Sequence, residues 1–349
     1  MFLRSGTTTD LEQIYNLTFK NAARCFTWGD DGLDYRMPLL RQGHFAVIAG
    51  AEGSGKTTWS IEMALQNARN GKVNEKPFYC GYLSLEMLPH RIVALYAQRK
   101  TQVKKEDIRN NFTLLLEGKE DLEARYMAAA KEFLDSNLCL FYNEDSEVTG
   151  IEYIENVCNQ ENRPDILFID NLNEITVKNM SNEYERFDLI LRELHRMKKQ
   201  YNVAFVLLHH LAKAKQGEPI SNNNIKGNNI VITKPDITVI IDKSMCPNFN
   251  WICPIFNNDG KIIKKKDRKA FMAEAPLTEY RKVDVKKDRD TDERGVKGYL
   301  SMPEGVIMVM DEIAVREKYP LSPKEKEYYR QMLAEKNASP ESNIPDSFE

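Results

Sequence analysis

Hydrophobic residues in the middle of the chain gather in short runs that alternate with longer amphipathic stretches. Six runs have the length and composition of buried strands: FAVIAG (45–50), FYCGYLSL (78–85), LCLFY (138–142), DILFID (165–170), VAFVLLH (203–209) and DITVIID (236–242). Strands that are buried on both faces read as continuous apolar runs, so the pattern predicts a mostly parallel sheet. We therefore predict an α/β fold with a twisted central sheet flanked by helices.

The stretches between these runs have apolar residues at helical spacing. In FDLILRELHRM (187–197) they recur every three or four positions, so one face of this helix is predicted to pack on the sheet. The part from about Trp251 to Val309 indicates further strands separated by charged turns.

Three segments are predicted along the chain. Residues 1–42 are expected to form a helix, LEQIYNLTFKNAARCF, and a turn-rich connector, TWGDDGLDYRMPLL. Residues 43–312 are expected to form one α/β domain, since 349 residues with 42% hydrophobic content can bury a sizeable core. Residues 313–349 are predicted to be a helix, KEKEYYRQMLAEK, followed by a disordered acidic tail.

Composition favours a soluble cytoplasmic protein. The net charge is -3, so any contact with nucleic acid must come from local basic clusters. The six cysteines form no C-x-x-C pair, which is typical of a reducing compartment. No apolar run is long enough to span a membrane, and the N-terminus lacks the apolar core of a signal peptide.

The segment GAEGSGKT (50–57) matches the phosphate-binding pattern G-x-x-x-x-G-K-[ST], between a predicted strand and a predicted helix. In this pattern backbone N–H groups surround the phosphates of ATP, the lysine neutralises the β/γ-phosphates, and the Thr hydroxyl binds Mg²⁺. The alternative is a plain glycine-rich turn, which the strand and helix context disfavours. The predicted nucleotide-binding residues are Gly50, Glu52, Gly53, Ser54, Gly55, Lys56, Thr57 and Thr58.

Two carboxylates follow predicted strands at the same edge of the sheet. Asp170 ends DILFID, where a carboxylate can hold Mg²⁺ together with Thr57, and Glu86 follows YLSL, where it could polarise the attacking water. Taken alone, Asp170 could be a turn or helix-capping residue and Glu86 an ordinary surface glutamate.

The runs GHFAVIAGAEGSGKTT, YLSLEM, ILFIDNLNEI, VAFVLLHHLAK and KKDRD resemble, in order and spacing, the motor domain of DnaB-type replicative helicases and their phage and plasmid relatives. The resemblance covers roughly residues 27–310 and implies a RecA-like P-loop ATPase. It implies that Glu86 is the catalytic base, that Asp170 belongs to the Mg²⁺ site, and that His210 senses the γ-phosphate. His209 would take that role if the register were shifted by one, and each histidine could also be an ordinary residue at a strand end.

The resemblance also implies a DNA-binding loop. KAKQGEPISNNNIKGNN contributes Lys213, Lys215, Lys226 and Gly227, and in the related helicases this loop grips the phosphates of single-stranded DNA. The alternative is a solvated surface loop.

A Lys-x-Arg pair, Lys287 and Arg289 in VDVKKDRD, corresponds to the pair that reaches the γ-phosphate of a neighbouring subunit. Without the resemblance, an ordinary surface charge cluster would explain both residues.

These features together predict an ATP- and Mg²⁺-dependent DNA helicase that forms a ring, expected to be a hexamer, and translocates on single-stranded DNA in replication. Other replication proteins are possible partners, although 42 residues are too few for the helical N-terminal domain of DnaB-type helicases. Two alternatives stay open: a RecA-type recombinase or filament-forming ATPase, and an ATP-dependent switch protein that does not unwind DNA.

Overall fold

The computed structural model describes residues 25–70, 72–73, 76–101, 120–143, 148–180, 182–211, 230–242, 280–292, 294–301 and 308–310. Its centre is a nine-stranded sheet with the order β13-β12-β11-β10-β3-β9-β8-β6-β7. The six strands from β10 to β7 are mutually parallel. The prediction of a mostly parallel sheet is therefore confirmed.

The parallel strands lie where the apolar runs predicted them, to within two residues. They are β3 (Phe45–Gly50), β6 (Cys80–Ser84), β7 (Leu138–Phe141), β8 (Ile166–Asp170), β9 (Ala204–His210) and β10 (Ile237–Asp242). Strands β3, β6, β8 and β10 are buried along their whole length, as continuous apolar runs require.

Three strands extend the sheet beyond β10 in antiparallel fashion: β11 (Tyr280–Asp288), β12 (Gly295–Ser301) and β13 (Met308–Met310). They lie within the part of the chain for which further strands were predicted. Residues 251–279 of that part lie outside the described residues.

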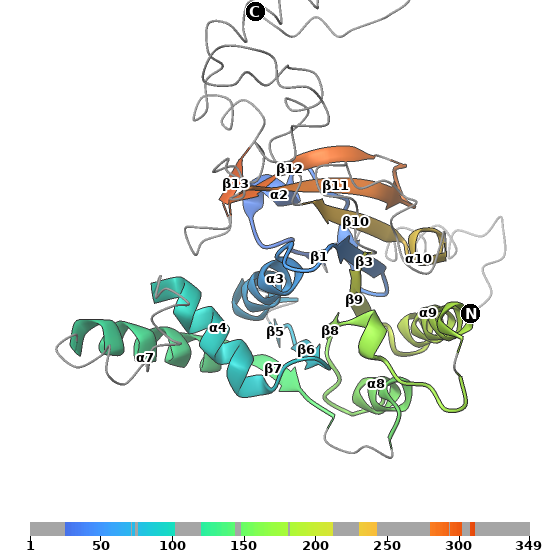
Figure 1. Ribbon diagram of the computed structural model, residues 1–349, viewed down its shortest axis with the longest axis horizontal. Helices are drawn as coiled ribbons and strands as arrows, with labels where there is room; N and C mark the ends of the chain where they lie inside the picture. Colours follow the sequence, from blue (N-terminus) through green and yellow to red (C-terminus); the bar gives the residue numbers. More distant parts are fainter. Residues whose placement is uncertain are drawn as a thin grey trace, which may run out of the picture.

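Helices cover both faces of the sheet (Figure 1). On one face lie α3 (Lys56–Asn70) and α4 (Pro89–Thr101), with α7 (Glu120–Leu134) packed against α4. On the other face lie α8 (Gly150–Cys158), α9 (Glu183–Tyr201) and the short α10 (Ile230–Thr233). The predicted apolar face of α9 is confirmed, with Phe187, Ile190, Leu191, Leu194 and Met197 all buried.

Local sequence signals explain where two of these helices begin and end. Helix α8 starts at a capping box, in which Thr149 and Glu152 each accept a hydrogen bond from the other's backbone N–H. Helix α9 starts after Asn182, which accepts a bond from Tyr184 N, and ends at Asn202 in the left-handed conformation.

The described part of the N-terminal segment packs onto the sheet domain. Strand β1 (Cys25–Phe26) pairs with β2 (Leu40–Arg41), and helix α2 (Asp31–Asp34) lies between them in sequence. Trp28 is buried, and its carbonyl accepts a 2.9 Å hydrogen bond from Trp59 Nε1 of α3. The helix predicted for residues 11–26 therefore cannot extend to Cys25 and Phe26, because strand pairing with β2 fixes them as extended chain.

The rest of that predicted helix, the predicted C-terminal helix and the acidic tail lie outside the described residues. Two short strands, β4 (Lys72–Val73) and β5 (Lys76–Pro77), form a separate antiparallel pair. Within the described ranges, none of the helices combines the length and the apolar character needed to cross a bilayer.

Candidate nucleotide-binding site

The phosphate-binding segment lies between the end of β3 and the start of α3 at Lys56. Gly50 has no room for a side chain, since a Cβ there would lie 2.5 Å from Ser54 Oγ and 2.8 Å from the Ile241 carbonyl oxygen. Gly55 has φ of 93°, a conformation that favours glycine. The glycines of the motif are thus required by the close packing and by the backbone conformation of the loop.

Lys56 is held across the mouth of this loop. Its side chain is buried, and Nζ donates to the carbonyl oxygens of Gly50 at 2.8 Å and Ala51 at 3.0 Å. A cation fixed at this point, beside the backbone of the loop and the N-terminus of α3, is suited to bind phosphate.

Asp170 lies beneath the loop at the end of β8 and is 2% exposed. Its Oδ2 accepts hydrogen bonds from Thr57 Oγ1 at 2.8 Å and Tyr82 OH at 3.0 Å. Burial, with a smaller contribution from the charge of Glu86, raises the pKa of Asp170 although both hydrogen bonds act to lower it.

The oxygen atoms of Asp170 and Thr57 could serve as ligands of a magnesium ion. Asp170 Oδ1 is buried and accepts no hydrogen bond from the part of the chain that the structure describes. The Thr57 hydroxyl lies next to the same carboxylate. Magnesium prefers oxygen ligands, and its charge would offset the cost of burying the carboxylate.

Glu86 follows β6 and lies next to two polar side chains. Asn171 Nδ2 donates to Glu86 Oε2 at 2.8 Å, and His210 Nε2 lies 3.7 Å from the same oxygen. The other ring nitrogen of His210 lies 3.4 Å from Lys56 Nζ. His210 therefore lies between Lys56 and the candidate base Glu86.

His209 points to the face of the sheet opposite to that of His210. It is buried, and its ring contacts Phe187 of α9 edge-on, with centroids 5.5 Å apart. Because neighbouring residues of a strand point to opposite faces, only one of the two histidines can lie beside Lys56. That residue is His210, and its predicted role as a sensor stays a prediction.

A cavity of about 430 Å³ joins these groups, and it is lined by Glu52, Gly53, Gly55, Lys56, Thr57, Thr58, Glu86, Leu95, Gln98, Arg99, His210 and Arg281. The lining residues from α4 and β11 were not predicted from the sequence. Arg99 NH1 lies 3.8 Å from Glu62 of α3, and burial lowers the pKa of Arg99. No spacing pattern marks these residues, because they reach the cavity only through the packing of α4 and the register of β11.

Lys287 and Arg289 lie near the other ends of the strands, away from the phosphate loop. Lys287 pairs with Thr238 and through it with Val47, whereas Val283 pairs with Ile241 and thereby with Gly50 of the phosphate loop. The Lys-x-Arg pair therefore lies near the start of β3, away from the phosphate loop of its own chain.

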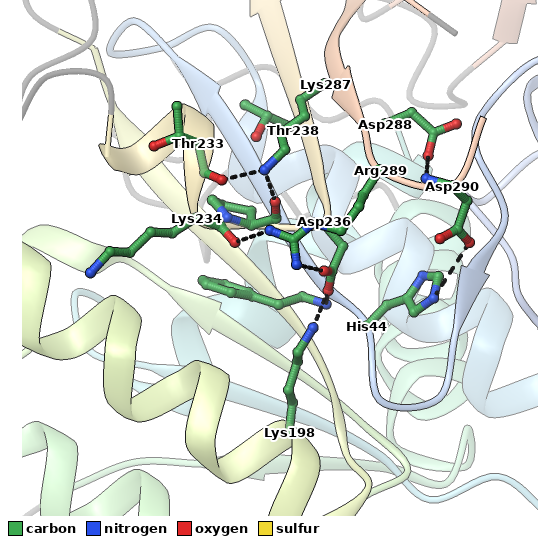
Figure 2. Close-up of polar contacts among 12 residues, drawn as sticks. His44, Lys198, Thr233, Lys234, Asp236, Thr238, Lys287, Asp288, Arg289 and Asp290 are labelled. Atoms are coloured by element: carbon green, nitrogen blue, oxygen red, sulfur yellow. Dashed lines mark hydrogen bonds and ion pairs between the residues drawn. The ribbon is translucent and has the colours of Figure 1, made fainter. Parts of the chain in front are cut away.

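Figure 2 shows that both side chains contact the turn after α10. Lys287 Nζ donates to the carbonyl oxygens of Thr233 and Pro235, and Arg289 donates to Asp236 Oδ1 at 2.8 Å and to the Lys234 carbonyl oxygen at 3.2 Å. Burial, followed by the neighbouring charge of Arg289, lowers the pKa of Lys287 to about 8.

The predicted DNA-binding residues Lys213, Lys215, Lys226 and Gly227 lie outside the described residues. The ends of that loop are described. Strand β9 enters it directly after His210 and Leu211, and α10 follows it from Ile230. The described residues that flank the segment are thus Leu211, next to His210, and Ile230, the first residue of α10.

A family model described as "AAA domain" matches residues 28–216 of the chain. Among curated proteins, the chain is similar to a "Probable plasmid replicative DNA helicase" of Chlamydia psittaci, with 24% identity over 53% of this chain and 38% of the relative. A protein of the same description from Chlamydia trachomatis serovar L2 is 26% identical over 54% of this chain and 40% of the relative. The chain spans about two fifths of the length of these relatives.

Two solved structures have the same fold. One is described as an ATPase domain; it has a TM-score of 0.62 and 16% identity, covering 88% of this chain and 100% of that chain. "The Structure Of A DnaB-Like Replicative Helicase And Its Interactions With Primase" has a TM-score of 0.60 and 16% identity, covering 87% of this chain and 67% of the other. These likenesses confirm the predicted RecA-like P-loop fold.

Proposed function

The chain belongs to the AAA domain family, and from that premise we propose that it is the ATP-hydrolysing motor of a DNA helicase. It would act in DNA replication, in the cytoplasm, as a ring of subunits that translocates on single-stranded DNA. The descriptions of the chlamydial relatives and the shared fold of the DnaB-like helicase support this proposal.

One observation supports it most directly. His210 lies 3.4 Å from Lys56 Nζ and 3.7 Å from Glu86 Oε2, at the end of the strand that leads into residues 212–229. A change at the γ-phosphate would therefore reach, through one side chain, the segment that contains Lys213, Lys215 and Lys226. Motion coupled to nucleotide state requires such a connection between the two sites.

In the proposed reaction, the backbone of the phosphate loop and Lys56 bind the triphosphate of ATP. Thr57 and Asp170 would hold Mg²⁺, which supplies positive charge to the phosphate oxygens when bound. Glu86, oriented by Asn171, accepts the proton of the attacking water. His210 contacts the γ-phosphate and passes its loss on to the DNA-binding loop.

Lys287 and Arg289 would complete the site of a neighbouring subunit. Their distance from the phosphate loop of the same chain favours action across a subunit boundary, where positive charge stabilises the departing phosphoryl group. Because the two halves of such a site lie at different edges of each subunit, the subunits associate head to tail. A hexameric ring is the assembly that we propose, with other replication proteins as further partners.

The test is turnover and unwinding by the Glu86→Gln variant. We expect single-stranded DNA to stimulate ATP hydrolysis by the wild type, which should also unwind a forked duplex. Glu86→Gln should lose roughly 10²–10⁴-fold in turnover, the usual contribution of a general base, and still bind ATP. Glu161→Gln, which changes an exposed glutamate, is the matched control and should resemble the wild type.

The alternatives predict different results for the wild-type protein. ATP hydrolysis that does not respond to single-stranded DNA would favour the switch protein. Pairing of homologous strands without unwinding would favour the recombinase. Loss of ATP binding by Lys56→Ala is expected under all three hypotheses, so it tests the nucleotide site alone.

A further inference from the structure

Strand β11 places an arginine where its own pattern calls for an apolar residue. Val283 and Val285 are fully buried on the face of the sheet that α3 covers. Side chains alternate along a strand, so Arg281 is the next position on this face. The apolar row thus ends in a guanidinium at the edge of the sheet where the phosphate loop begins.

The register explains why Arg281 reaches the loop. Val283 pairs with Ile241, and Ile241 pairs with Gly50, the first residue of the loop. Two residues before Val283, Arg281 Nε donates to the Ser54 carbonyl oxygen at 3.1 Å. This bond ties Arg281 to the loop, and Arg281 forms part of the wall of the candidate nucleotide cavity together with Gly53, Gly55 and Lys56.

The charge of Arg281 is partly removed from water at this position. Burial lowers the pKa of Arg281. A cation in such surroundings is stabilised by an anion that enters the same cavity, and a guanidinium matches the geometry of phosphate oxygens through several N–H donors.

We propose that Arg281 is a substrate-binding residue that contacts the phosphates of the nucleotide bound by the same protomer. The inference rests on the proposed nucleotide site and adds a cation to it from the antiparallel part of the sheet. This cation acts in addition to Lys56 and is distinct from Lys287 and Arg289, which serve the neighbouring subunit. The competing explanation is that Arg281 only holds the shape of the loop through the Ser54 carbonyl.

The test compares the Arg281→Met variant, which keeps the length and the apolar stem of the side chain, with Lys286→Met on the same strand. Lys286 pairs with Asp284 and does not line the cavity, so its variant is the matched control. The measurements are the affinity for a fluorescent ATP analogue and its displacement by inorganic tripolyphosphate, which has neither base nor ribose.

We expect Arg281→Met to weaken the binding of both ligands by roughly tenfold or more, the usual effect of losing a hydrogen bond to a charged group. Lys286→Met should bind both like the wild type, and Lys56→Ala should lose binding.

Normal binding by Lys56→Ala would overturn the proposed nucleotide site itself. Normal binding by Arg281→Met alongside a defective Lys56→Ala would overturn this inference only. A loss restricted to the ATP analogue would assign Arg281 to the base or ribose and overturn the phosphate contact.

A second measurement uses the wild-type protein and does not depend on the folding of a variant. Phenylglyoxal modifies accessible arginines, and mass spectrometry follows each one. Tripolyphosphate should slow the modification of Arg281 severalfold and leave the exposed Arg125 of α7 unchanged. Equal rates at Arg281 with and without tripolyphosphate would support the purely structural role and overturn the inference.

Discussion

Glu86 is oriented by an amide whose own position is fixed at both ends. Asn171 Nδ2 donates to Glu86 Oε2 at 2.8 Å, and Asn171 Oδ1 accepts a 2.9 Å bond from the backbone N–H of Asn173. The amide is buried, while the Glu86 side chain is 53% exposed. An exposed carboxylate has many rotamers, so this contact selects the one that faces His210 and the cavity.

Replacing Asn171 with alanine should therefore reduce turnover more than binding. We expect Asn171→Ala to lower the kcat for ATP hydrolysis roughly tenfold, as residues that orient a reacting group commonly do, with little change in KM. Steady-state kinetics of ATP hydrolysis measures both constants.

The control for this variant is Asn156→Ala, which removes an exposed amide from α8. Thermal unfolding of both variants separates a loss of fold from a loss of orientation. An Asn171→Ala protein with normal stability and normal kcat would show that Glu86 does not depend on the amide.

The sequence predicted some residues of the site and could not predict others. Lys56, Thr57 and Asp170 could be predicted because their motifs are local or follow a strand directly. Tyr82 and Arg281 were missed because their contacts with Asp170 and Ser54 bridge 88 and 227 positions of the chain, so only strand register brings them together.

At the scale of secondary structure, Asp236 joins four elements. Its carboxylate accepts bonds from Lys198 of α9, from the backbone N–H of Phe45 at the start of β3, and from Arg289 after β11, and Asp236 itself precedes β10 (Figure 2). Burial alone would raise the pKa of Asp236, but Lys198, the Phe45 N–H and Arg289 together lower it below its ordinary value of 3.8.

This carboxylate should make stability depend on pH. A lowered pKa in the folded state stabilises the protein above the unfolded-state value of 3.8, and this stability is lost as the pH falls through the folded-state pKa. We expect Asp236→Asn to reduce the free energy of unfolding at pH 7 by about 3 kcal/mol, because Lys198 is left buried without its anion. The difference from the wild type should shrink below about pH 4, as urea unfolding at several pH values would measure.

Asp292→Asn is the comparison for Asp236→Asn. Asp292 pairs with Arg294 on the surface, and such pairs contribute about 1 kcal/mol or less. If the two variants lost stability equally, or if the Asp236→Asn deficit stayed constant in acid, Asp236 would not have the proposed effect.

Long elements were predictable from the sequence and short ones were not. The parallel strands of the core are continuous apolar runs, and the pattern located all six. Strands β1 and β2 have two residues each and α2 has four, too few for any period to emerge. Strand β1 falls in the stretch that was predicted as a helix, and α2 falls in the predicted turn-rich connector. Trp28 and Leu33 of that connector nevertheless lie in the core, because tertiary packing fixes these residues.

At the scale of the whole molecule, the cations predicted to act on nucleotide lie near opposite ends of the central strands. Lys56 and Arg281 are at the edge where β3 ends and β11 begins, and Lys287 and Arg289 are at the other edge. Arg289 follows Arg281 by eight positions, which span about 26 Å in extended chain. The two pairs of cations are therefore too far apart to contact the same nucleotide within a single subunit.

Mixing of variants tests this division. In the proposed ring, Lys56→Ala subunits would lack a working phosphate loop and Arg289→Ala subunits would lack the cation for their neighbour, so each protein alone should be inactive. Equal amounts mixed at random would place an intact loop beside an intact arginine at roughly a quarter of the boundaries, and activity should return in proportion.

The mixture requires two checks, because Arg289 also contacts Asp236. Both variants must assemble by size-exclusion chromatography and unfold at wild-type temperatures, and a mixture of Lys56→Ala with the double variant Lys56→Ala and Arg289→Ala should stay inactive. No recovery of ATP hydrolysis in well-folded mixed assemblies would contradict action between subunits.

The central position of β3 in the sheet determines how readily its backbone can open to solvent. Parallel neighbours flank it on both sides and helices cover both of its faces, whereas β7 and β13 form the margins. Spontaneous opening begins at exposed margins and reaches a central strand last, so backbone amides of β3 should exchange with solvent only when the entire sheet opens. The phosphate loop is anchored to this central strand, so we expect it to keep its shape while the borders of the sheet fray and re-form.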